Sequence, residues 1–346
     1  MTDTGTSTQQ WPDAGALDRW MTDNIDGFKG PVTLSKFEGG QSNPTFRIDA
    51  PSGRYVLRRK PMGAVLPGAH AVDREFRVLS AMHKAGVPVA RVYQLCTDES
   101  VIGSIFYVMD FVDGRVFWDP RLPDLTAAER RSIFESMNDN IARIHSLSPD
   151  KVGLSDFGRS EGYLNRQISR WTRQYDASRI DPNPAMDNLI AWLPDHVPDE
   201  HPPRLVHGDY RLDNVLIHPT EPRIVAVLDW ELSTIGNPIA DFAYHMLTWH
   251  FAPDLYRGLA GVDLAALGIP GEEEYLARYL KTTGLEPPKD WQFYLILSMF
   301  RIASILQGVA KRSVEGSAAD AKAAEVGAKA VPISQLAWNL VEQRGR

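Results

Sequence analysis

Polar residues interrupt an apolar stretch between positions 204 and 217, which reads RLVHGDYRLDNVLI. The apolar residues on either side predict two short β segments that run toward a core. The polar side chains between them are His207, Asp209, Arg211, Asp213 and Asn214. Because a buried polar group left unpaired costs roughly 1–3 kcal/mol, the stretch indicates either a well-bonded turn or a site for a polar ligand.

The spacing of the oxygen-bearing residues favours a site. A second apolar strand, RIVAVLDW at 223–230, ends near another carboxylate, Asp229, and can pair with the segment after Asn214. Asn and Asp oxygens suit Mg²⁺, which usually takes one or two protein ligands and completes its octahedron with water and phosphate oxygens. Asp209 would then be available as a proton acceptor. This set predicts phosphoryl transfer, which needs positioning, charge neutralisation and one carboxylate that orients the attacking hydroxyl.

The elements that must position these residues fall into two groups. An amphipathic helix near 17–25 precedes a β-rich region, in which we expect three antiparallel strands within 31–60, a helix over 70–85 and two strands at 91–96 and 104–112. Beyond Gly114 the patterns predict helices at 126–147, 161–177, 185–193, 239–250, 272–282, 290–310 and 317–343. The expected fold is α+β, with an N-terminal tail and helix at 1–29, a small β lobe at 30–112 and a larger, mainly helical lobe at 113–346.

Composition excludes several function classes. Lys and Arg total 37 against 44 Asp and Glu, a net charge of −7, and no run of five basic residues occurs, which argues against nucleic acid and anionic membranes as partners. Cys96 is the single cysteine, so no intrachain disulfide forms, and a reducing compartment fits. The first residues do not read as a secretory signal, and no stretch approaches 18 apolar residues, so no membrane-spanning helix is expected. We therefore expect a cytoplasmic protein.

The motifs also carry a resemblance. HGDYRLDN is similar to the protein-kinase catalytic loop, and VLDWE is similar to the strand that ends in D-F-G. The Gly after the His, the Trp after Asp229 and the segment GNPIADFAY resemble the aminoglycoside phosphotransferase and choline kinase branch. YVLRRKP, HAVDREFRVLSAM, FYVMDFVDGRVF and EGYLNRQISRW resemble the kinase-like domains found alone in bacteria and fused to acyl-CoA dehydrogenases. The resemblance covers roughly residues 30–310 and implies a protein kinase-like two-lobe fold.

Roles follow from the resemblance position by position. It implies that Asp209 is the catalytic base, that His207 braces the loop and that Asn214 and Asp229 bind Mg²⁺. Asp241 would hold the loop through backbone amides. The implied nucleotide-binding residues are the turn residues Gly39, Gly40, Ser42 and Asn43, the pair Arg58 and Glu75, and Asp110 and Val112 of a hinge that bonds adenine.

Several positions depart from the kinase pattern. Arg58 stands where the family has Lys, although Lys60 on the same strand face is an alternative phosphate cation. The glycine turn reads GGQSN, so side chains of Ser42 or Asn43 would replace backbone contacts. The short interval between Asp229 and Asp241 leaves no room for an ordinary activation loop. SDFG at 155–158 lies too early in the chain to be the metal strand, and we expect Asp156 in a loop.

The substrate side rests on a helix face. Tyr163, Gln167 and Arg170 recur at helical spacing and are the predicted acceptor contacts. Trp249, His250 and Arg301 are further candidates for the rim. For Arg211 and Asp213 only solvent contact or a mutual salt bridge is expected.

The leading hypothesis is a kinase that uses Mg²⁺ and ATP to phosphorylate a hydroxyl group of a small molecule, with GTP still open as the donor. The fused relatives point to a hydroxylated acyl compound as the acceptor. The alternatives are an aminoglycoside-type antibiotic kinase, a nucleotide-binding pseudokinase that acts as a binding module, and a metal-dependent hydrolase with His207 and Asp209 as ligands. The complete set of Asp209, Asn214 and Asp229 argues against the pseudokinase.

Overall fold

The computed structural model describes residues 11–37, 43–62, 71–316 and 322–344. Gly39, Gly40 and Ser42 of the predicted glycine turn lie outside these residues. The chain divides into two compact units, residues 1–113 and 114–346. The first is rich in strands and the second is mainly helical, which confirms the expected α+β class.

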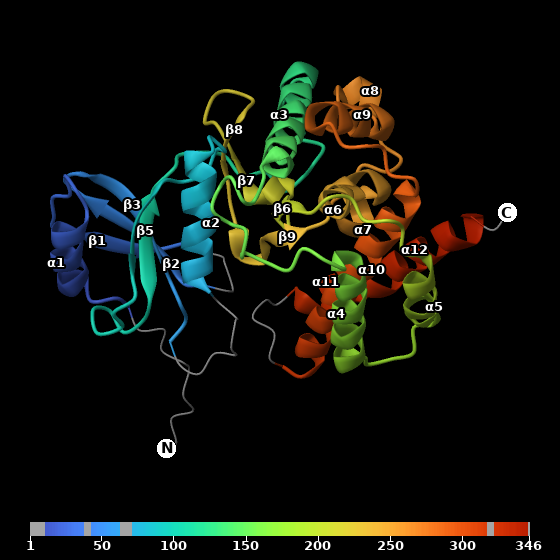
Figure 1. The fold of residues 1–346 in the computed structure, drawn as a ribbon, viewed down its shortest axis with the longest axis horizontal. Coiled ribbons are helices and arrows are strands. Elements are labelled where there is room, and N and C mark those ends of the chain that lie inside the picture. The colour runs from blue at the N-terminus through green and yellow to red at the C-terminus, as the bar shows by residue number, and fades with distance from the viewer. Residues whose placement is uncertain (1–10, 38–42, 63–70, 317–321, 345–346) are drawn as a thin grey trace. The chain divides into compact units, whose positions relative to one another are not determined.

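The first unit is built on a five-stranded antiparallel sheet (Figure 1). Its strands are β1 (Thr33–Lys36), β2 (Thr45–Ala50), β3 (Gly53–Arg59), β4 (Val92–Cys96) and β5 (Phe106–Asp110). They lie side by side in the order β1-β2-β3-β5-β4, and each neighbouring pair is antiparallel. All five predicted strands are therefore present, and β3, which carries Arg58, is central in the sheet.

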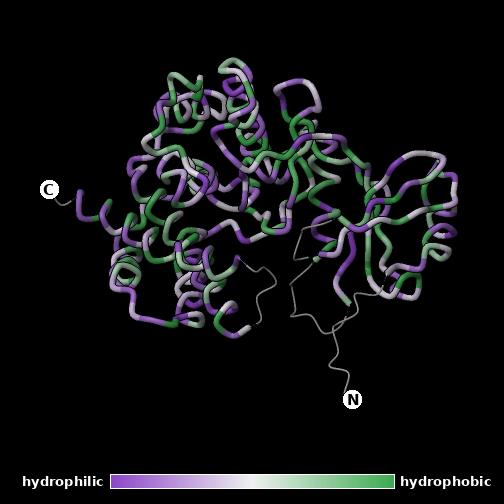
Figure 2. The backbone as a smooth tube through the Cα atoms, turned by 180° about the vertical axis from the view of Figure 1, so that it is seen from behind, coloured by the Kyte–Doolittle hydropathy of each residue, from purple (hydrophilic) through white to green (hydrophobic). Residues whose placement is uncertain are grey.

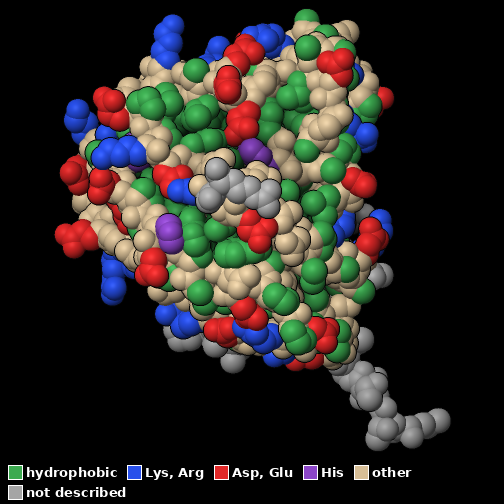
Figure 3. Space-filling view, turned by 90° about the vertical axis from the view of Figure 1, so that its right-hand side faces the viewer, with side chains coloured by type: hydrophobic (Ala, Val, Ile, Leu, Met, Phe, Trp, Pro, Cys, Tyr) green, Lys and Arg blue, Asp and Glu red, His purple; other side chains and the backbone are tan. Residues whose placement is uncertain are grey.

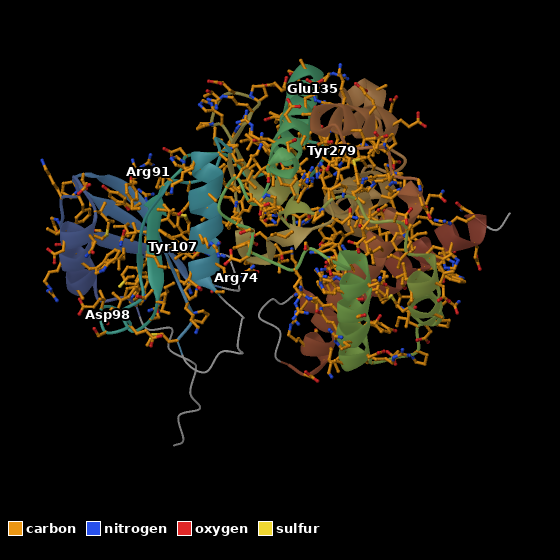
Figure 4. All side chains as sticks on the ribbon, in the orientation of Figure 1. Arg74, Arg91, Asp98, Tyr107, Glu135 and Tyr279 are labelled. Carbon is orange, nitrogen blue, oxygen red and sulfur yellow. The ribbon has the colours of Figure 1, made fainter. Side chains whose placement is uncertain are left out.

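Two helices cover the opposite faces of this sheet (Figure 1). Helix α1 (Ala14–Asn24) packs in one core cluster with Phe106 and Val108 of β5. Helix α2 (Val72–Lys84) lies on the other face, where Phe76 meets Tyr107 of β5 with ring centroids 6.0 Å apart. Successive residues of a strand point to opposite faces, so β5 packs against α1 with one face and against α2 with the other. Figure 4 shows Tyr107 on this strand.

The second unit consists of helices around α10 (Trp291–Val314). The others are α3 (Ala127–Ser146), α4 (Tyr163–Ser178), α5 (Pro184–Trp192), α6 (Pro238–His250), α7 (Pro253–Tyr256), α8 (Leu264–Leu267), α9 (Glu272–Thr283), α11 (Ala323–Ala328) and α12 (Ala330–Arg344). The predicted single helix at 317–343 is wrong, because the structure breaks it between Ala328 and Ala330. Pro332 explains the break, since a proline ring clashes with the carbonyl four residues before it, here that of Ala328.

Helix α10 is the core helix of the second unit. Its length and composition would allow it to cross a membrane, contrary to the expectation that no stretch of the sequence is long and apolar enough. However, 78% of its apolar window is buried inside the protein, where it packs against α4, α6, α11 and α12. In Figure 2, green and purple segments alternate along the helices of this unit, as expected for amphipathic helices around a core.

Two small antiparallel ladders interrupt the helices. Strand β7 (Val215–Ile217) pairs with β8 (Ile224–Val227), which confirms the predicted hairpin. Strand β6 (Arg204–Val206), which leads into the polar stretch, pairs instead with β9 (Thr234–Gly236), a strand that the sequence did not predict. The two ladders hold the polar stretch at both ends, and short 3₁₀ turns at Leu212–Asn214 and Trp230–Leu232 complete the region.

Candidate active site

His207 fastens the polar loop to the end of strand β8. Its Nε2 lies 2.8 Å from the carbonyl oxygen of Leu228, and its Nδ1 accepts the amide of Asp209 at 3.2 Å. Because a carbonyl only accepts, Nε2 carries the proton. The side chain is fully buried and both ring nitrogens are engaged within the protein. His207 therefore braces the loop, and it has no lone pair left for the metal that the hydrolase hypothesis requires.

Asp241 supports the same loop from helix α6. Its carboxylate accepts the backbone amides of His207 at 2.8 Å and Gly208 at 2.9 Å, which confirms the predicted contact. His145 of α3 adds a bond of 3.1 Å to this carboxylate and bonds the Tyr279 hydroxyl with its other nitrogen. Figure 4 shows Tyr279 among the side chains of the second unit. Burial raises the pKa of Asp241, but the bonds from His145 and His207 outweigh it and the net pKa is lowered.

Asp209 is held through both oxygens of its carboxylate. Oδ2 accepts Nδ2 of Asn214 at 2.9 Å, and Oδ1 lies 3.2 Å from Nε of Arg211. The same Asn214 nitrogen also donates to the Asp209 carbonyl at 2.8 Å. The side chain keeps 18% of its surface exposed, so a ligand can still reach it. Two residues of its own loop thus fix the orientation of this carboxylate.

Asn214 and Asp229 lie at the adjoining ends of β7 and β8. The amide of Leu228 donates to the Asn214 carbonyl at 2.8 Å, which joins the two segments directly before Asp229. Asp229 has left-handed backbone angles, φ 60° and ψ 64°, which cost a residue other than glycine about 1–2 kcal/mol. Strain of this kind often marks a functional position.

These two residues fit a magnesium ion. Since Nδ2 of Asn214 faces Asp209, the amide oxygen is the atom that the side chain can offer to a cation. An amide oxygen with a carboxylate is a hard-oxygen pair of the kind that Mg²⁺ accepts. Within the described ranges, no group of three or more His, Cys, Asp or Glu side chains is arranged to hold a metal.

Arg301 joins the loop from helix α10. Its guanidinium donates to the carbonyl of Gly208 and lies 4.1 Å over the ring of Tyr244 and 5.2 Å over that of Trp171. Of the three rim candidates, Arg301 therefore contacts the loop. Trp249 bonds Pro270 and His250 bonds Glu272 instead.

The predicted acceptor helix α4 is engaged mostly in internal contacts. Tyr163 is buried, and its ring occupies the space beside Gly236. Gln167 accepts the indole N–H of Trp171 at 3.0 Å, and the guanidinium of Arg170 lies 5.0 Å over the same ring. The structure thus places Arg170 and Arg301 on one indole, while the acceptor role of all three predicted residues stays a prediction.

Sequence reasoning missed the residue that orients the start of α4. Both oxygens of Glu200 accept backbone amides at this helix start, those of Tyr163 at 3.2 Å and Leu164 at 2.9 Å. A carboxylate is favourable at a helix N-terminus. Glu200 lies 36 residues from Leu164, in a proline-rich connection without a motif, so no local signal could have found it.

The first unit contains the predicted pair on β3 and α2. Nε of Arg58 donates to Glu75 at 2.7 Å, and the side chains are only 15% and 4% exposed. This confirms the expected contact between them. Lys60 follows the end of β3, where its amide bonds the Ile105 carbonyl at 2.9 Å. Asn43, the described member of the glycine turn, is buried, and its carbonyl accepts the Thr45 hydroxyl at 3.0 Å.

The predicted hinge follows strand β5. The amide of Asp110 donates to the carbonyl of Arg91 at 2.8 Å and that of Phe111 to the carbonyl of Arg54 at 3.4 Å, so both amides already have partners within the protein. The Tyr93 hydroxyl bonds the side chain of Asp110. Among the residues that the structure describes, the amide of Val112 has no such partner. The literal D-F-G segment lies elsewhere, with Asp156 in a turn between α3 and α4 as predicted.

A small hollow lies beside the loop in the second unit. Its walls are aromatic and aliphatic side chains with a few polar groups: Trp118, Pro120, Arg211, Leu212, Asp213, Tyr244, Leu247, Thr248, Phe251, Tyr256, Arg257 and Ile302. Its volume of about 40 Å³ admits a few water molecules or a small apolar group. Because Arg211 also contacts Asp209, the hollow is a direct neighbour of the predicted base.

Comparisons with known proteins show which family and which proteins the chain is similar to. The model of a family described as the phosphotransferase enzyme family matches residues 33–290. The mouse protein named acyl-CoA dehydrogenase family member 10 is 44% identical over 318 residues, which are 91% of this chain but only 30% of that protein. The chain thus spans less than a third of this relative.

Solved structures show the same similarity. A Ralstonia eutropha protein described provisionally as an aminoglycoside phosphotransferase is 49% identical, with a TM-score of 0.90 over 96% of this chain and 99% of that one. A spectinomycin phosphotransferase, solved with ADP and spectinomycin, shares the fold at 12% identity, with a TM-score of 0.62 over 96% of this chain and 100% of that one.

Proposed function

This chain belongs to the phosphotransferase enzyme family, and on that premise we propose that it transfers the γ-phosphoryl group of ATP to a hydroxyl group of a small molecule. The proposal is based mainly on the contacts and the exposure of the Asp209 carboxylate. One oxygen of its carboxylate accepts a hydrogen bond from Asn214, the other forms an ion pair with Arg211, and the side chain is still partly exposed. A general base must be held in place and accessible to its substrate, and these contacts support that role for Asp209.

The loop residues then divide the work. Asp209 accepts the proton of the acceptor hydroxyl while the hydroxyl oxygen attacks the γ-phosphorus of ATP and ADP leaves. His207 and Asp241 keep the backbone of the loop in place. Asn214 and Asp229 would hold Mg²⁺. The ion, when bound, neutralises charge on the phosphate oxygens.

The first unit would bind the nucleotide. Glu75 orients Arg58, whose guanidinium can also bond phosphate oxygens. The carbonyl of Asp110 and the amide of Val112 would bond adenine, since the amides of Asp110 and Phe111 already serve the sheet and its surroundings. The spectinomycin phosphotransferase with bound ADP supports a nucleotide as the donor.

We further propose a hydroxylated acyl compound as the acceptor. The similarity to an acyl-CoA dehydrogenase family member supports this class. The walls of the small hollow argue against a cationic acceptor there, because they are mainly apolar and Asp213, the carboxylate among them, is already paired with Arg211 and Arg257. A polycationic aminoglycoside would require carboxylates that are free to pair with it. Charges of both signs are scattered over the face in Figure 3 without a large acidic area.

The test is ADP formation by the purified protein with a panel of acceptors. Hydroxy acids, their CoA esters, amino alcohols and aminoglycosides are compared with Mg-ATP and with Mg-GTP. We expect stimulation by the hydroxyacyl compounds. Asp209→Asn should keep nucleotide binding and lower turnover by about 10²–10⁴. Binding of Mg-ATP without turnover on any acceptor would favour the pseudokinase, and stimulation by aminoglycosides alone would favour the antibiotic kinase.

A second measurement tests the metal assignment. Asp229→Ala should abolish the part of the thermal stabilisation by ATP that depends on Mg²⁺, because one of two protein oxygens is lost. The same shift in Asp229→Ala as in the unmodified protein would remove Asp229 from the site.

A further inference from the structure

Arg211 lies in a chain of ion pairs that begins at the base. Its Nε is 3.2 Å from Oδ1 of Asp209, and its other end bonds Oδ2 of Asp213 at 3.2 Å. Arg257 bonds the same Asp213 oxygen at 2.6 Å. The expected salt bridge between Arg211 and Asp213 is therefore present, and the contact with Asp209 is an addition that the sequence did not predict.

Arg211 is held as a cation in this chain. Burial by itself would lower its pKa, but Asp209, Tyr244 and Asp213 outweigh burial and the net pKa is raised. The side chain of Arg211 is 27% exposed and that of Asp213 is 9% exposed, so water screens their attraction less than on an open surface. Asp209 thus faces a permanent positive charge.

Arg257 is the last residue of this series of ion pairs, and its backbone conformation is unusual. Arg257 has left-handed angles, φ 47° and ψ 52°, although it is not glycine, and this conformation costs about 1–2 kcal/mol. Its guanidinium lies 4.5 Å over the ring of Trp118, a side chain that is 59% exposed. The hydroxyl of Tyr256 accepts a bond of 3.5 Å from Arg211. Tyr256 therefore contacts Arg211 directly, and its neighbour Arg257 contacts Asp213, the partner of Arg211.

Resting on the proposed function, we propose that Arg211 is a positioning residue that fixes the carboxylate of Asp209 for proton transfer, and that Asp213 and Arg257 fix Arg211. Asn214 donates a hydrogen bond to one oxygen of Asp209 and the Arg211 guanidinium forms an ion pair with the other, so both contacts oppose rotation of the carboxylate about its last bond. Arg211, Asp213 and Arg257 also line the hollow, so the residues that orient the base form part of the wall beside it.

The test compares variants of Arg211 in the full chain. Turnover of Mg-ATP is measured as ADP formation with water as acceptor and with the best acceptor of the panel. Arg211→Gln should lower kcat by about 10–100-fold, since misplacing a catalytic group by about 1 Å can cost 10²-fold. The KM for ATP should change less than about twofold, because the inferred role concerns the base and not the nucleotide. Arg211→Lys, which keeps the charge without the planar fork, should give an intermediate kcat.

Two further measurements separate positioning from a merely structural role. Added guanidinium chloride at millimolar concentration should restore part of the kcat of Arg211→Ala. Asp213→Asn should lower kcat in the unmodified protein and add little in the Arg211→Gln background, because the two residues act through one contact. Arg278→Gln is the matched control, since it breaks another Arg–Asp pair of the same unit, with Asp139 at 2.8 Å, far along the chain from the loop.

Each outcome decides the inference. An unchanged kcat in Arg211→Gln, or a loss equal to that of Arg278→Gln, overturns it. A large rise in the KM for ATP also overturns it, because Arg211 would then serve the nucleotide. If the unmodified protein forms no ADP with any acceptor, the proposed function fails and the inference with it. Full activity in both the unmodified protein and Arg211→Gln leaves the proposed function standing and removes Arg211 alone.

Discussion

The carboxylate of Asp241 accepts the backbone amide of His207 at 2.8 Å, across 34 residues of sequence. It also accepts the next amide, that of Gly208, at 2.9 Å. Asn237 caps the start of α6, so Asp241 lies in the first turn of that helix with its side chain beneath the loop. A single buried carboxylate thus sets the path of the backbone directly before the predicted base.

Replacement of Asp241 by Asn should destabilise the protein and reduce turnover. The amide group of Asn has one acceptor oxygen, so one of the two buried backbone N–H groups loses its partner. A buried donor left unpaired costs about 1–3 kcal/mol. We expect a loss of this size in the free energy of unfolding from urea titration. Asp139→Asn is the control, because Asp139 is half exposed and bonds the exposed Arg278 in α9. Equal stability of the two variants would contradict the role assigned to Asp241.

Gly208→Ala should damage the loop more than the same change at a comparable glycine. Gly208 has φ 86°, and a Cβ there would lie 2.7 Å from the carbonyl oxygen of Leu232, which is backbone and cannot move aside cheaply. Gly261 has a similar φ of 79°, and a Cβ at that position would meet nothing within 4 Å, so Gly261→Ala tests the backbone angle alone. We expect Gly261→Ala to cost about 1–2 kcal/mol and Gly208→Ala to cost more and to lower kcat. Equal melting temperatures would contradict the close approach.

The elements of the first unit could be predicted from sequence because their signals are local. Alternating apolar residues mark β2, a short apolar run marks β3, and a helical period marks α2. Strand β9 has only three residues, Thr234–Gly236, and becomes a strand because β6 offers it a partner. The local sequence of this segment does not predict such pairing. The break before α12 was missed because the apolar period continues through Pro332.

In the candidate site, too, local features could be predicted from the sequence and contacts with distant residues could not. The His207, Asp209, Asn214 and Asp229 set was predictable because the chemistry demands those residue types at fixed spacing. The contact of Arg211 with Asp209 was not, because sequence spacing does not show that one Arg can contact both neighbouring Asp residues at once. The cluster also includes Tyr256, which bonds Arg211, and Arg257, which bonds Asp213, and both lie more than 40 residues away in sequence and carry no motif.

Stability should fall in mild acid because of His245. Burial lowers the pKa of this side chain from 6.5 to about 4. A folded-state pKa below that of the unfolded chain means that the unfolded state binds the proton first, so the stability is present above pH 6.5 and is lost as the pH falls toward 4. A shift of this size corresponds to a loss on the order of 3 kcal/mol.

The measurement is the free energy of unfolding by urea between pH 7.5 and 4. His245→Gln, which keeps a polar group near the Tyr275 hydroxyl that His245 bonds at 2.9 Å, should be less stable at neutral pH and should show a shallower slope over this range. Carboxylates titrate in both proteins, so the difference between the slopes isolates His245. Parallel slopes would show that His245 is not the group responsible.

Arg58, rather than Lys60, should carry the positive charge that binds phosphate. Removing Arg58 alone would leave the Glu75 carboxylate buried without this cation, which costs about 3–5 kcal/mol. The test variant is therefore the pair Arg58→Met with Glu75→Leu, which removes both charges together. We expect it to raise the KM for ATP at least about tenfold while the protein stays folded, and Lys60→Met to change the KM less than about twofold. The reverse pattern, a raised KM in Lys60→Met alone, would transfer the phosphate role to Lys60 and leave the pair of Arg58 and Glu75 as a structural tie between β3 and α2.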